Sequence, residues 1–292
     1  MVTNVLSLFN GMSTGHTALD NVGIKVGKYY SSEIKPAAIK LTQHHYPDTI
    51  QLGDVTKWKE WDIDWKNIDM VLSGSPCQDL SIAGKQKGLE GERSSLFWVF
   101  IDILNHIKEL NPKVLFLQEN VGSAPKKDVG IMSRALGVYP VRINSSLVTA
   151  QLRDRYYWTN IRTKSDGLFG DMVTDIPQPE DKKIMFKDIL IEATTDRKKC
   201  NCLLERGYKD IYKNMERFKK HIERKKSQGF EPPIHAIVGE NVRNLYVVEY
   251  CRLQGFPDNW CDGVTKQEAI SLLGDGWTLP IIEHIFSFIN ER

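Results

Sequence analysis

One cysteine of this sequence stands where the chain could use it as a nucleophile. Cys77 follows the apolar run 70–72, which is typical of a short buried strand, and residues 74–76, Gly-Ser-Pro, end that strand and turn the chain outward. Open α/β sheets bind their ligands at the carboxyl ends of their strands, so we expect the thiol at a binding edge. The next segment, 82–93, interleaves three glycines with charged residues, as in a loop that closes over a substrate. The chemistry indicated is attack by a thiolate that nearby cations activate.

Two further groups of polar side chains follow predicted strands. Glu119 comes after the apolar strand 113–118, where a partly desolvated carboxyl group can donate a proton or a hydrogen bond. Arg153 and Arg155 stand two residues apart, on one face of an extended segment, and suit a carboxylate, phosphate or carbonyl partner. The alternatives are a helix-capping or surface acid for Glu119 and an exposed edge strand for the two arginines.

The first strand, residues 5–9, ends in a glycine-containing turn that leads into a helix from His16. Gly11 and Gly15 let the backbone approach a ligand, and Glu33 follows the next strand at the distance where an acid can hold ribose hydroxyls. This arrangement favours a nucleoside-containing cofactor. The turn lacks the G-x-G-x-x-G spacing, which makes a dinucleotide less favoured, and a purely structural turn remains the alternative.

These residues need a sheet that brings strand ends together, and the pattern of the first 162 residues predicts one. Short β-branched or aromatic runs alternate with helix-like stretches, which indicates an α/β fold with a parallel sheet and covering helices. Apolar residues at helical spacing predict an amphipathic helix over 94–110. The runs read as strands are 5–9, 28–31, 70–72, 114–117 and 156–158.

After residue 162 the sequence becomes rich in Gly, Asp and Pro, so we predict that a second, smaller module begins near 163. Within it, residues 197–226 hold 12 Lys and Arg against 4 Asp and Glu, although the whole chain carries a net charge of only +2. Apolar residues from 204 to 222 recur at helical spacing, and the charges occupy the other face of that helix. That face is either a solvated surface or one that contacts phosphates. The apolar helix after residue 274 needs a partner and is expected to pack back on the first module.

Composition restricts the remaining possibilities. With 292 residues, 41% of them hydrophobic, the chain can bury an extensive core, and no run reaches the roughly 18 apolar residues of a membrane span. No basic leader precedes the first strand, so we expect a cytoplasmic protein. The five cysteines are an odd and scattered set, which supports neither a disulfide framework nor a zinc site, and those other than Cys77 are assigned to packing.

Taken in order, these motifs resemble those of the cytosine-5 DNA methyltransferases, which use S-adenosylmethionine. Cys77 lies in Gly-Ser-Pro-Cys-Gln, which resembles the nucleophile motif, and Glu119 opens a Glu-Asn-Val motif. Gln-x-Arg-x-Arg at 151–155 resembles the paired arginines, and residues 243–257 resemble the segment before the last motif. The segment 81–97 is similar to the catalytic loop of the bacterial enzymes. The closing stretch 274–284 is more similar to the vertebrate de novo branch, with Asp275 in place of the usual Asn, while Asn10 stands where that branch has Asp and Tyr246 replaces a common Thr.

The resemblance implies a Rossmann-like methyltransferase sheet, formed by 1–162 and 250–292, and a target-recognition domain at 163–249. It implies that Cys77 adds to C6 of a flipped-out cytosine, with Glu119 at N3 and with Arg153, less securely Arg155, at O2 or the covering loop. The residues implied for cofactor binding are Phe9, Gly11, Gly15, Glu33, Asp54, Val55, Pro76, Leu96, Asp275 and Trp277. Those implied for DNA contact are Gln78, Ser81, Lys85 and Arg93.

The expected partners are double-stranded DNA and S-adenosylmethionine, with no metal and no membrane. A cognate restriction endonuclease is a further candidate partner. We expect the protein to be a monomer, since this state needs no additional assumption. Three alternatives stay open at this point: methylation of RNA cytosine by the same residues, a non-catalytic DNA-binding relative, and a nucleotide-dependent oxidoreductase. The second predicts a damaged nucleophile or acid, whereas Cys77, Glu119 and Arg153 are all present. The third would leave Cys77 without a role.

Overall fold

The computed structural model divides the chain into two compact units. We call one the sheet unit, comprising Met1–Ile143, Asp154–Gln178 and Ile281–Arg292, and the other the second unit, comprising Asn144–Arg153 and Pro179–Pro280. The structure describes residues 3–76, 95–167, 170–204, 236–238, 241–291 and six single positions between 216 and 228. The predicted Cys77, Gln78, Ser81, Lys85 and Arg93, and most of the basic stretch 197–226, lie outside the described residues.

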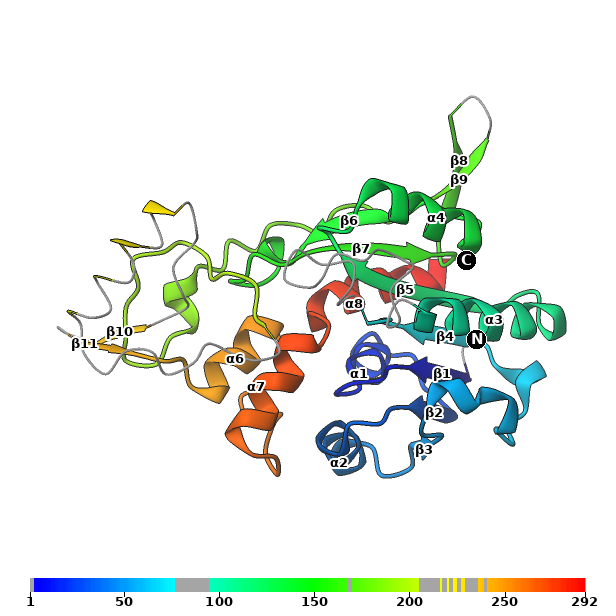
Figure 1. The fold of residues 1–292 in the computed structure, drawn as a ribbon, viewed down its shortest axis with the longest axis horizontal. Coiled ribbons are helices and arrows are strands. Elements are labelled where there is room, and N and C mark those ends of the chain that lie inside the picture. The colour runs from blue at the N-terminus through cyan, green and yellow to red at the C-terminus, as the bar shows by residue number, and fades with distance from the viewer. Residues whose placement is uncertain are drawn as a thin grey trace. The chain divides into compact units, whose positions relative to one another are not determined.

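A seven-stranded sheet organises the sheet unit, with the strand order β3-β2-β1-β4-β5-β7-β6 (Figure 1). Its strands are β1 (Asn4–Leu8), β2 (Lys28–Ser32), β3 (Ile50–Gln51), β4 (Met70–Ser73), β5 (Leu115–Val121), β6 (Val141–Asn144) and β7 (Asp154–Thr159). Its helices are α1 (Thr14–Asn21), α2 (Pro36–His45), α3 (Ser95–Leu110), α4 (Lys126–Leu136) and most of α8 (Leu279–Phe286). Short 3-10 helices η1 (Val55–Glu60), η2 (Trp65–Asn67) and η6 (Ser287–Glu291) and a hairpin of β8 (Thr163–Asp166) and β9 (Asp171–Thr174) complete it.

The α/β fold class predicted from the alternation of strands and helices is confirmed. All five runs read as strands lie in the sheet, and the helix predicted over 94–110 is α3. The sheet is not wholly parallel, however, because β7 runs antiparallel to β5. Between β6 and β7 the chain forms only the 3-10 helix η4 (Ser145–Leu147), and a parallel connection needs a longer crossover, usually a helix.

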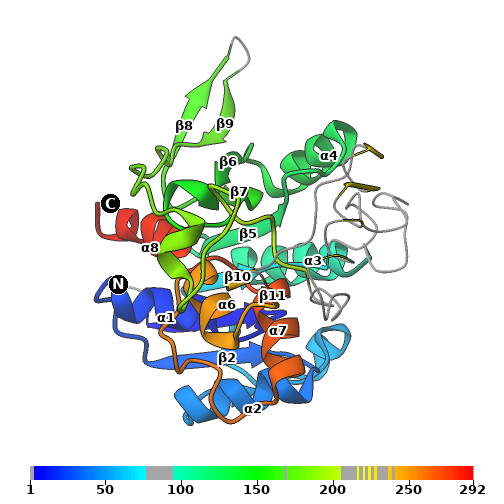
Figure 2. The same ribbon diagram turned by 90° about the vertical axis from the view of Figure 1, so that its left-hand side faces the viewer.

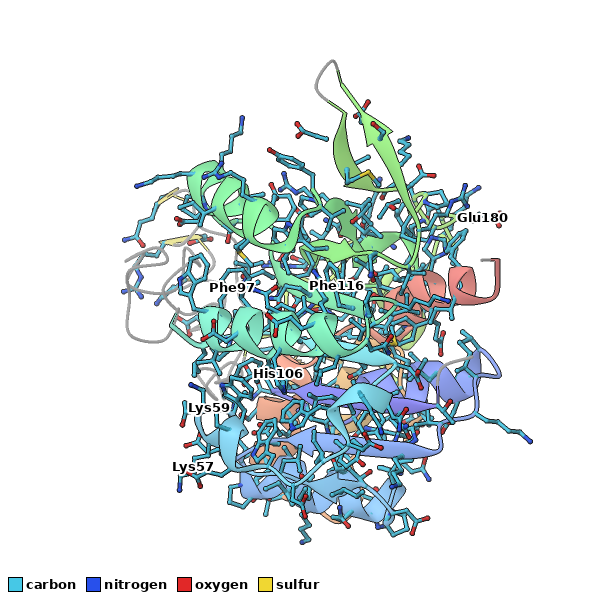
Figure 3. The ribbon with its side chains drawn as sticks, turned by 90° about the vertical axis from the view of Figure 1, so that its right-hand side faces the viewer. Lys57, Lys59, Phe97, His106, Phe116 and Glu180 are labelled. Carbon is cyan, nitrogen blue, oxygen red and sulfur yellow. The ribbon has the colours of Figure 1, made fainter. Side chains whose placement is uncertain are left out.

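The two faces of the sheet are covered by different helices. Figures 1 and 2 show α3 and α4 on one face and α1 and α8 on the other. An extensive apolar layer lies under α3 and α4, where Phe97 and Phe100 of α3 join Phe116 of β5 and Trp158 of β7, all nearly inaccessible to solvent. Figure 3 labels Phe97 and Phe116 in this layer. On the opposite face α1 lies close to the sheet because Gly15 has no side chain, and a Cβ there would collide with Leu72.

Among the described residues of the second unit, two helices pack together and two strands pair. The helices are α6 (Val247–Gln254) and α7 (Lys266–Asp275), the strands are β10 (Ala236–Val238) and β11 (Asn241–Arg243), and η5 (Phe186–Ile189) is a 3-10 helix. Gly255 ends α6 with a φ of 81°, and a side chain at that position would collide with Pro280. This unit takes in α6, which spans the predicted boundary at 249, and α7, which lies beyond it. A target-recognition role for 163–249 stays a prediction.

Among the described residues, no helix combines the length and apolar character needed to cross a membrane.

Candidate active site

The turn after β1 has an unusual backbone. Phe9, Gly11 and Ser13 have φ values of 56°, 57° and 61°, so three alternate residues of a five-residue segment are left-handed. Side-chain-bearing residues seldom adopt this conformation, and such strain gathers at functional sites. Open space surrounds the position where Gly11 would carry a Cβ, whose nearest neighbour is the Phe9 carbonyl oxygen at 4.0 Å. We call residues 9–13 the β1 loop.

Glu33, at the end of β2, is tied to the β1 loop. Its Oε2 accepts a hydrogen bond from the Gly11 N–H at 2.8 Å, and its Oε1 accepts from the N–H groups of Ile34 and Lys35 at 2.8 and 2.9 Å. Three backbone N–H groups therefore fix the orientation of the Glu33 carboxylate, which lies beside the open space at Gly11. A carboxylate held in this way, beside a glycine turn at the carboxyl edge of a sheet, fits a ribose-containing cofactor.

The other predicted cofactor residues of the sheet unit lie at the starts of helices beyond β3 and β4. Asp54 caps η1, and its pKa is lowered because its carboxylate accepts hydrogen bonds from the backbone and side chain of Thr56. Val55 is buried in the core under α3. Leu96, at the start of α3, packs against the same core.

The segment that leads to Cys77 is anchored to the neighbouring strand. β4 pairs with β5 in parallel register, with Ser73 opposite Gln118. β4 ends at this pair, whereas β5 continues to Val121 along β7, so Glu119 lies within the strand and not after it as predicted. Beyond that pair, the Gln118 side-chain amide donates to Ser75 Oγ at 3.0 Å, and both residues are buried. The backbone that enters Pro76 is thereby held beside the strand that carries Glu119.

Glu119 forms an ion pair with Arg155, the second of the two predicted arginines. Arg155 Nε lies 2.8 Å from Glu119 Oε1, and both side chains are largely buried, with 13% and 12% of their surface exposed. The antiparallel register explains the contact, since Glu119 lies opposite Tyr157 and Arg155 lies diagonally from it, opposite Val121. The side chain of Glu119 is therefore held in one direction by this partner. The parallel sheet predicted from the sequence does not bring these two side chains together, whereas the antiparallel pairing does.

Arg153 has a different environment, within the second unit. Its guanidinium donates to the backbone carbonyls of Gly274 and Gly276 at 3.2 and 2.8 Å, and to Leu203 O at 3.4 Å. The carbonyls of Gly274 and Gly276 flank Asp275, which is exposed. Trp277, which follows Gly276, is half-buried. The described contacts of Arg153 therefore hold the backbone of the closing motif, whereas those of Arg155 hold Glu119.

A buried ion pair stabilises the second unit at the start of α6. The fully buried Glu249 accepts hydrogen bonds from both Arg243 Nη atoms, at 2.8 and 2.7 Å, and from the backbone N–H groups of Tyr246 and Ile191. Tyr246, which replaces a common Thr of the motif, contributes its backbone to this arrangement and lies under the Arg243 guanidinium at 3.9 Å.

We expect Glu249→Gln to lower the stability of the second unit by about 3–5 kcal/mol, because it leaves the Arg243 charge without its buried partner. Urea unfolding followed by hydrogen exchange in α6 measures the change. The matched control is Asp258→Asn, which breaks the exposed Arg252–Asp258 pair and should cost about 0–1 kcal/mol. Equal effects of the two substitutions would contradict the assignment.

His16, directly after Gly15, lies between two tyrosine rings. Its ring stacks on Tyr29 and Tyr46 at centroid distances of 4.3 and 3.8 Å, and its Nδ1 is buried without a hydrogen-bond partner in the described part of the chain. Burial lowers the pKa of His16, and the nearby Asp20 carboxylate opposes that shift. The neutral ring is therefore the form that the fold accommodates.

The stability of the sheet unit should depend on pH through His16. Below about pH 6.5 His16 takes up a proton more readily in the unfolded chain than in the folded chain. Its contribution to the free energy of unfolding therefore decreases as the pH falls. Urea midpoints measured from pH 7.5 to 5.5 should decline more steeply for the wild type than for His16→Phe. Parallel declines would show that His16 titrates normally.

Comparisons with known proteins find matches over nearly the whole chain. The family described as C-5 cytosine-specific DNA methylase matches residues 3–221 and 204–291. The type II methyltransferase M.HpaII of Haemophilus parainfluenzae is 27% identical over 338 residues, covering 98% of this chain and 89% of the relative. The orphan methyltransferase M.SPRI of Bacillus phage SPR is 34% identical over 173 residues, which are 54% of this chain but only 37% of that relative.

Solved structures show the same fold at low sequence identity. The Entamoeba histolytica methyltransferase EhMeth matches with a TM-score of 0.68 and 16% identity, over 100% of this chain and 98% of that one. The Dnmt2 methyltransferase of S. pombe matches with a TM-score of 0.65 and 17% identity, over 99% and 98%. The fold and the family together imply the use of S-adenosylmethionine in general.

Proposed function

Because the chain belongs to the C-5 cytosine-specific DNA methylase family, we propose that it transfers a methyl group from S-adenosylmethionine to C5 of cytosine in double-stranded DNA. The observation that carries the proposal is the arrangement at the ends of two neighbouring strands. The Ser75 side chain, two residues before Cys77, accepts a hydrogen bond from the Gln118 side chain, and the residue after Gln118, Glu119, is held by Arg155. A nucleophile that follows β4 and a fixed acid near the end of the adjacent β5 suit one small aromatic substrate.

Cytosine C5 is a weak nucleophile, and the proposed roles follow from that difficulty. The Cys77 thiolate adds to C6 while Glu119 gives a hydrogen bond or a proton to N3, so electron density moves to C5. S-adenosylmethionine, when bound, supplies the electrophilic methyl group at this carbon. Loss of the C5 proton then restores the double bond between C5 and C6 as the bond from C6 to Cys77 breaks.

The two arginines take different parts in this proposal. Arg155 keeps the Glu119 carboxylate in one direction and places positive charge near the base, where it can stabilise charge that develops on O2. Arg153 acts on the backbone around Asp275 and Trp277, two residues proposed to border the cofactor. We therefore assign the direct role at the base to Arg155 rather than to Arg153.

The cofactor is proposed to lie against the β1 loop. Glu33 would accept hydrogen bonds from the ribose hydroxyls, and Gly11, which has no side chain, would let the ligand approach the backbone. The remaining contacts would come from Phe9, Asp54, Val55, Pro76 and Leu96. Gly15 supports the site indirectly, because the absence of a side chain lets α1 pack closely on β4.

The DNA contacts are proposed from the sequence. A cytosine inside a duplex is out of reach, so it must be flipped out at a cost of a few kcal/mol, which phosphate contacts and a closing loop help to offset. Gln78, Ser81, Lys85 and Arg93 are proposed to contact the DNA beside the base, and the basic residues of 197–226 to contact phosphates. The protein would act in the cytoplasm, alone or beside a cognate restriction endonuclease.

Transfer of label tests the proposed substrate. With S-adenosylmethionine carrying a labelled methyl group, we expect label in duplex DNA and background levels in tRNA. Label in tRNA alone would overturn the proposal in favour of RNA methylation.

A further inference from the structure

A buried polar network lies behind the β1 loop, and it includes residues from outside every motif of the sequence. Asn10 donates through Nδ2 to Ser13 Oγ at 2.9 Å and to Thr42 Oγ1 at 3.2 Å, while its Oδ1 accepts from the Tyr29 hydroxyl at 3.2 Å. Thr42 comes from α2 and Tyr29 from β2. Each of the four side chains is at least nine-tenths buried. The loop is thus joined to two elements that follow it in the chain.

The hydrogen-bond donors and acceptors of these side chains can be matched with one another. Ser13 Oγ lies 2.7 Å from Thr42 Oγ1, and the Thr42 hydroxyl is placed to donate to the Gly11 carbonyl at 3.5 Å. If Ser13 donates to Thr42 and Thr42 to Gly11, both amide hydrogens and the amide oxygen of Asn10 are used, and no hydroxyl lacks an acceptor. An aspartate at position 10 would have no amide hydrogens and could not donate these two hydrogen bonds.

Two of the bonded residues belong to the β1 loop, whose backbone is strained. Ser13 is left-handed, and Asn10 lies between the left-handed Phe9 and Gly11. A left-handed conformation persists at side-chain-bearing residues only when the surroundings fix it. Thr42 supplies that constraint, since it contacts Asn10, Ser13 and the Gly11 carbonyl together. Gly11 is also the residue whose N–H holds the Glu33 carboxylate, so the network and the proposed ribose acid share one residue.

We propose that Thr42 and Tyr29 are positioning residues that fix the β1 loop in the conformation that receives S-adenosylmethionine. The inference rests on the proposed function, because it takes the β1 loop as the cofactor site. Neither residue needs to touch the cofactor. Each acts through Asn10, and Thr42 also acts through Ser13 and Gly11, so that binding requires less ordering of the loop.

Calorimetric titration of the protein with S-adenosylmethionine, without DNA, tests the inference. Thr42→Val keeps the shape of the side chain but removes its hydroxyl, and we expect about fivefold weaker binding. Thr42→Ser restores the hydroxyl and should bind as the wild type does. Tyr29→Phe is the second variant, with an expected loss of similar size.

The control separates positioning from a general loss of stability. Thr159→Val also removes a buried threonine hydroxyl from the sheet unit, one that donates to Phe116 O on β5. It should lower the melting temperature and leave cofactor affinity unchanged. Affinity of Thr42→Val and Tyr29→Phe within twofold of the wild type, or equal weakening by Thr159→Val, would overturn the inference. Absence of binding by the wild type would instead overturn the cofactor assignment.

Discussion

Replacement of Cys77 by alanine should abolish methyl transfer, with at least a 1,000-fold loss of kcat expected for removal of a covalent nucleophile. The same variant should fail to form a denaturation-resistant adduct with duplex DNA that contains 5-fluorocytosine. Fluorine at C5 cannot leave as the proton does, so the wild-type enzyme should remain attached through Cys77. Gel mobility under denaturing conditions measures the adduct.

Cys200→Ala is the matched control for this experiment. Cys200 is fully buried, and burial raises the pKa of its thiol well above the ordinary value, so it is held as an unreactive thiol. The control should be trapped on DNA as the wild type is. Trapping by Cys77→Ala would refute the assignment of the nucleophile.

The second large effect is expected at Glu119. Glu119→Gln retains the shape of the side chain but loses the carboxyl proton that N3 needs, so kcat should fall by about 100- to 10,000-fold. The affinity for S-adenosylmethionine should change little, because Glu119 belongs to β5 rather than to the strands that carry the β1 loop and Glu33. Single-turnover methylation of duplex DNA measures the chemical step directly.

Arg155→Lys gives an independent test of the same pair. A lysine keeps the charge but loses the planar Nε–H that contacts Glu119 Oε1, so an intermediate loss of kcat is expected. Glu109→Gln, an exposed change on α3, serves as the control and should leave kcat unchanged. Full activity of either Glu119→Gln or Arg155→Lys would show that this ion pair has no part in catalysis.

The sequence predicted the sheet well because its strands have strong local signals. The runs that became β1, β4 and β5 are buried along nearly their whole length, and such strands read as continuous apolar segments. In contrast, β3 comprises only Ile50 and Gln51, which is too short for a periodic pattern. The antiparallel direction of β7 also escaped prediction, since a strand has the same appearance in either direction.

Predicting the site required knowledge of contacts between residues that are far apart in the sequence. Glu119 and Cys77 were recognised from motifs, but the choice between Arg153 and Arg155 required the register of β5 and β7. Thr42 and Tyr29 gave no signal at all, because a buried threonine in a helix and a tyrosine in a strand are ordinary residues. Gly15 was predicted to bind the cofactor, and its described contacts show that it permits close packing of α1 on Leu72.

Identification of the methylated nucleoside tests the central claim most directly. Duplex DNA incubated with the wild-type protein and S-adenosylmethionine would be digested to nucleosides and analysed by chromatography with mass spectrometry. We predict 5-methyl-2′-deoxycytidine as the new product, and its absence after incubation with Cys77→Ala. Methyl groups on an exocyclic nitrogen of cytosine or adenine, with none at C5, would contradict the account.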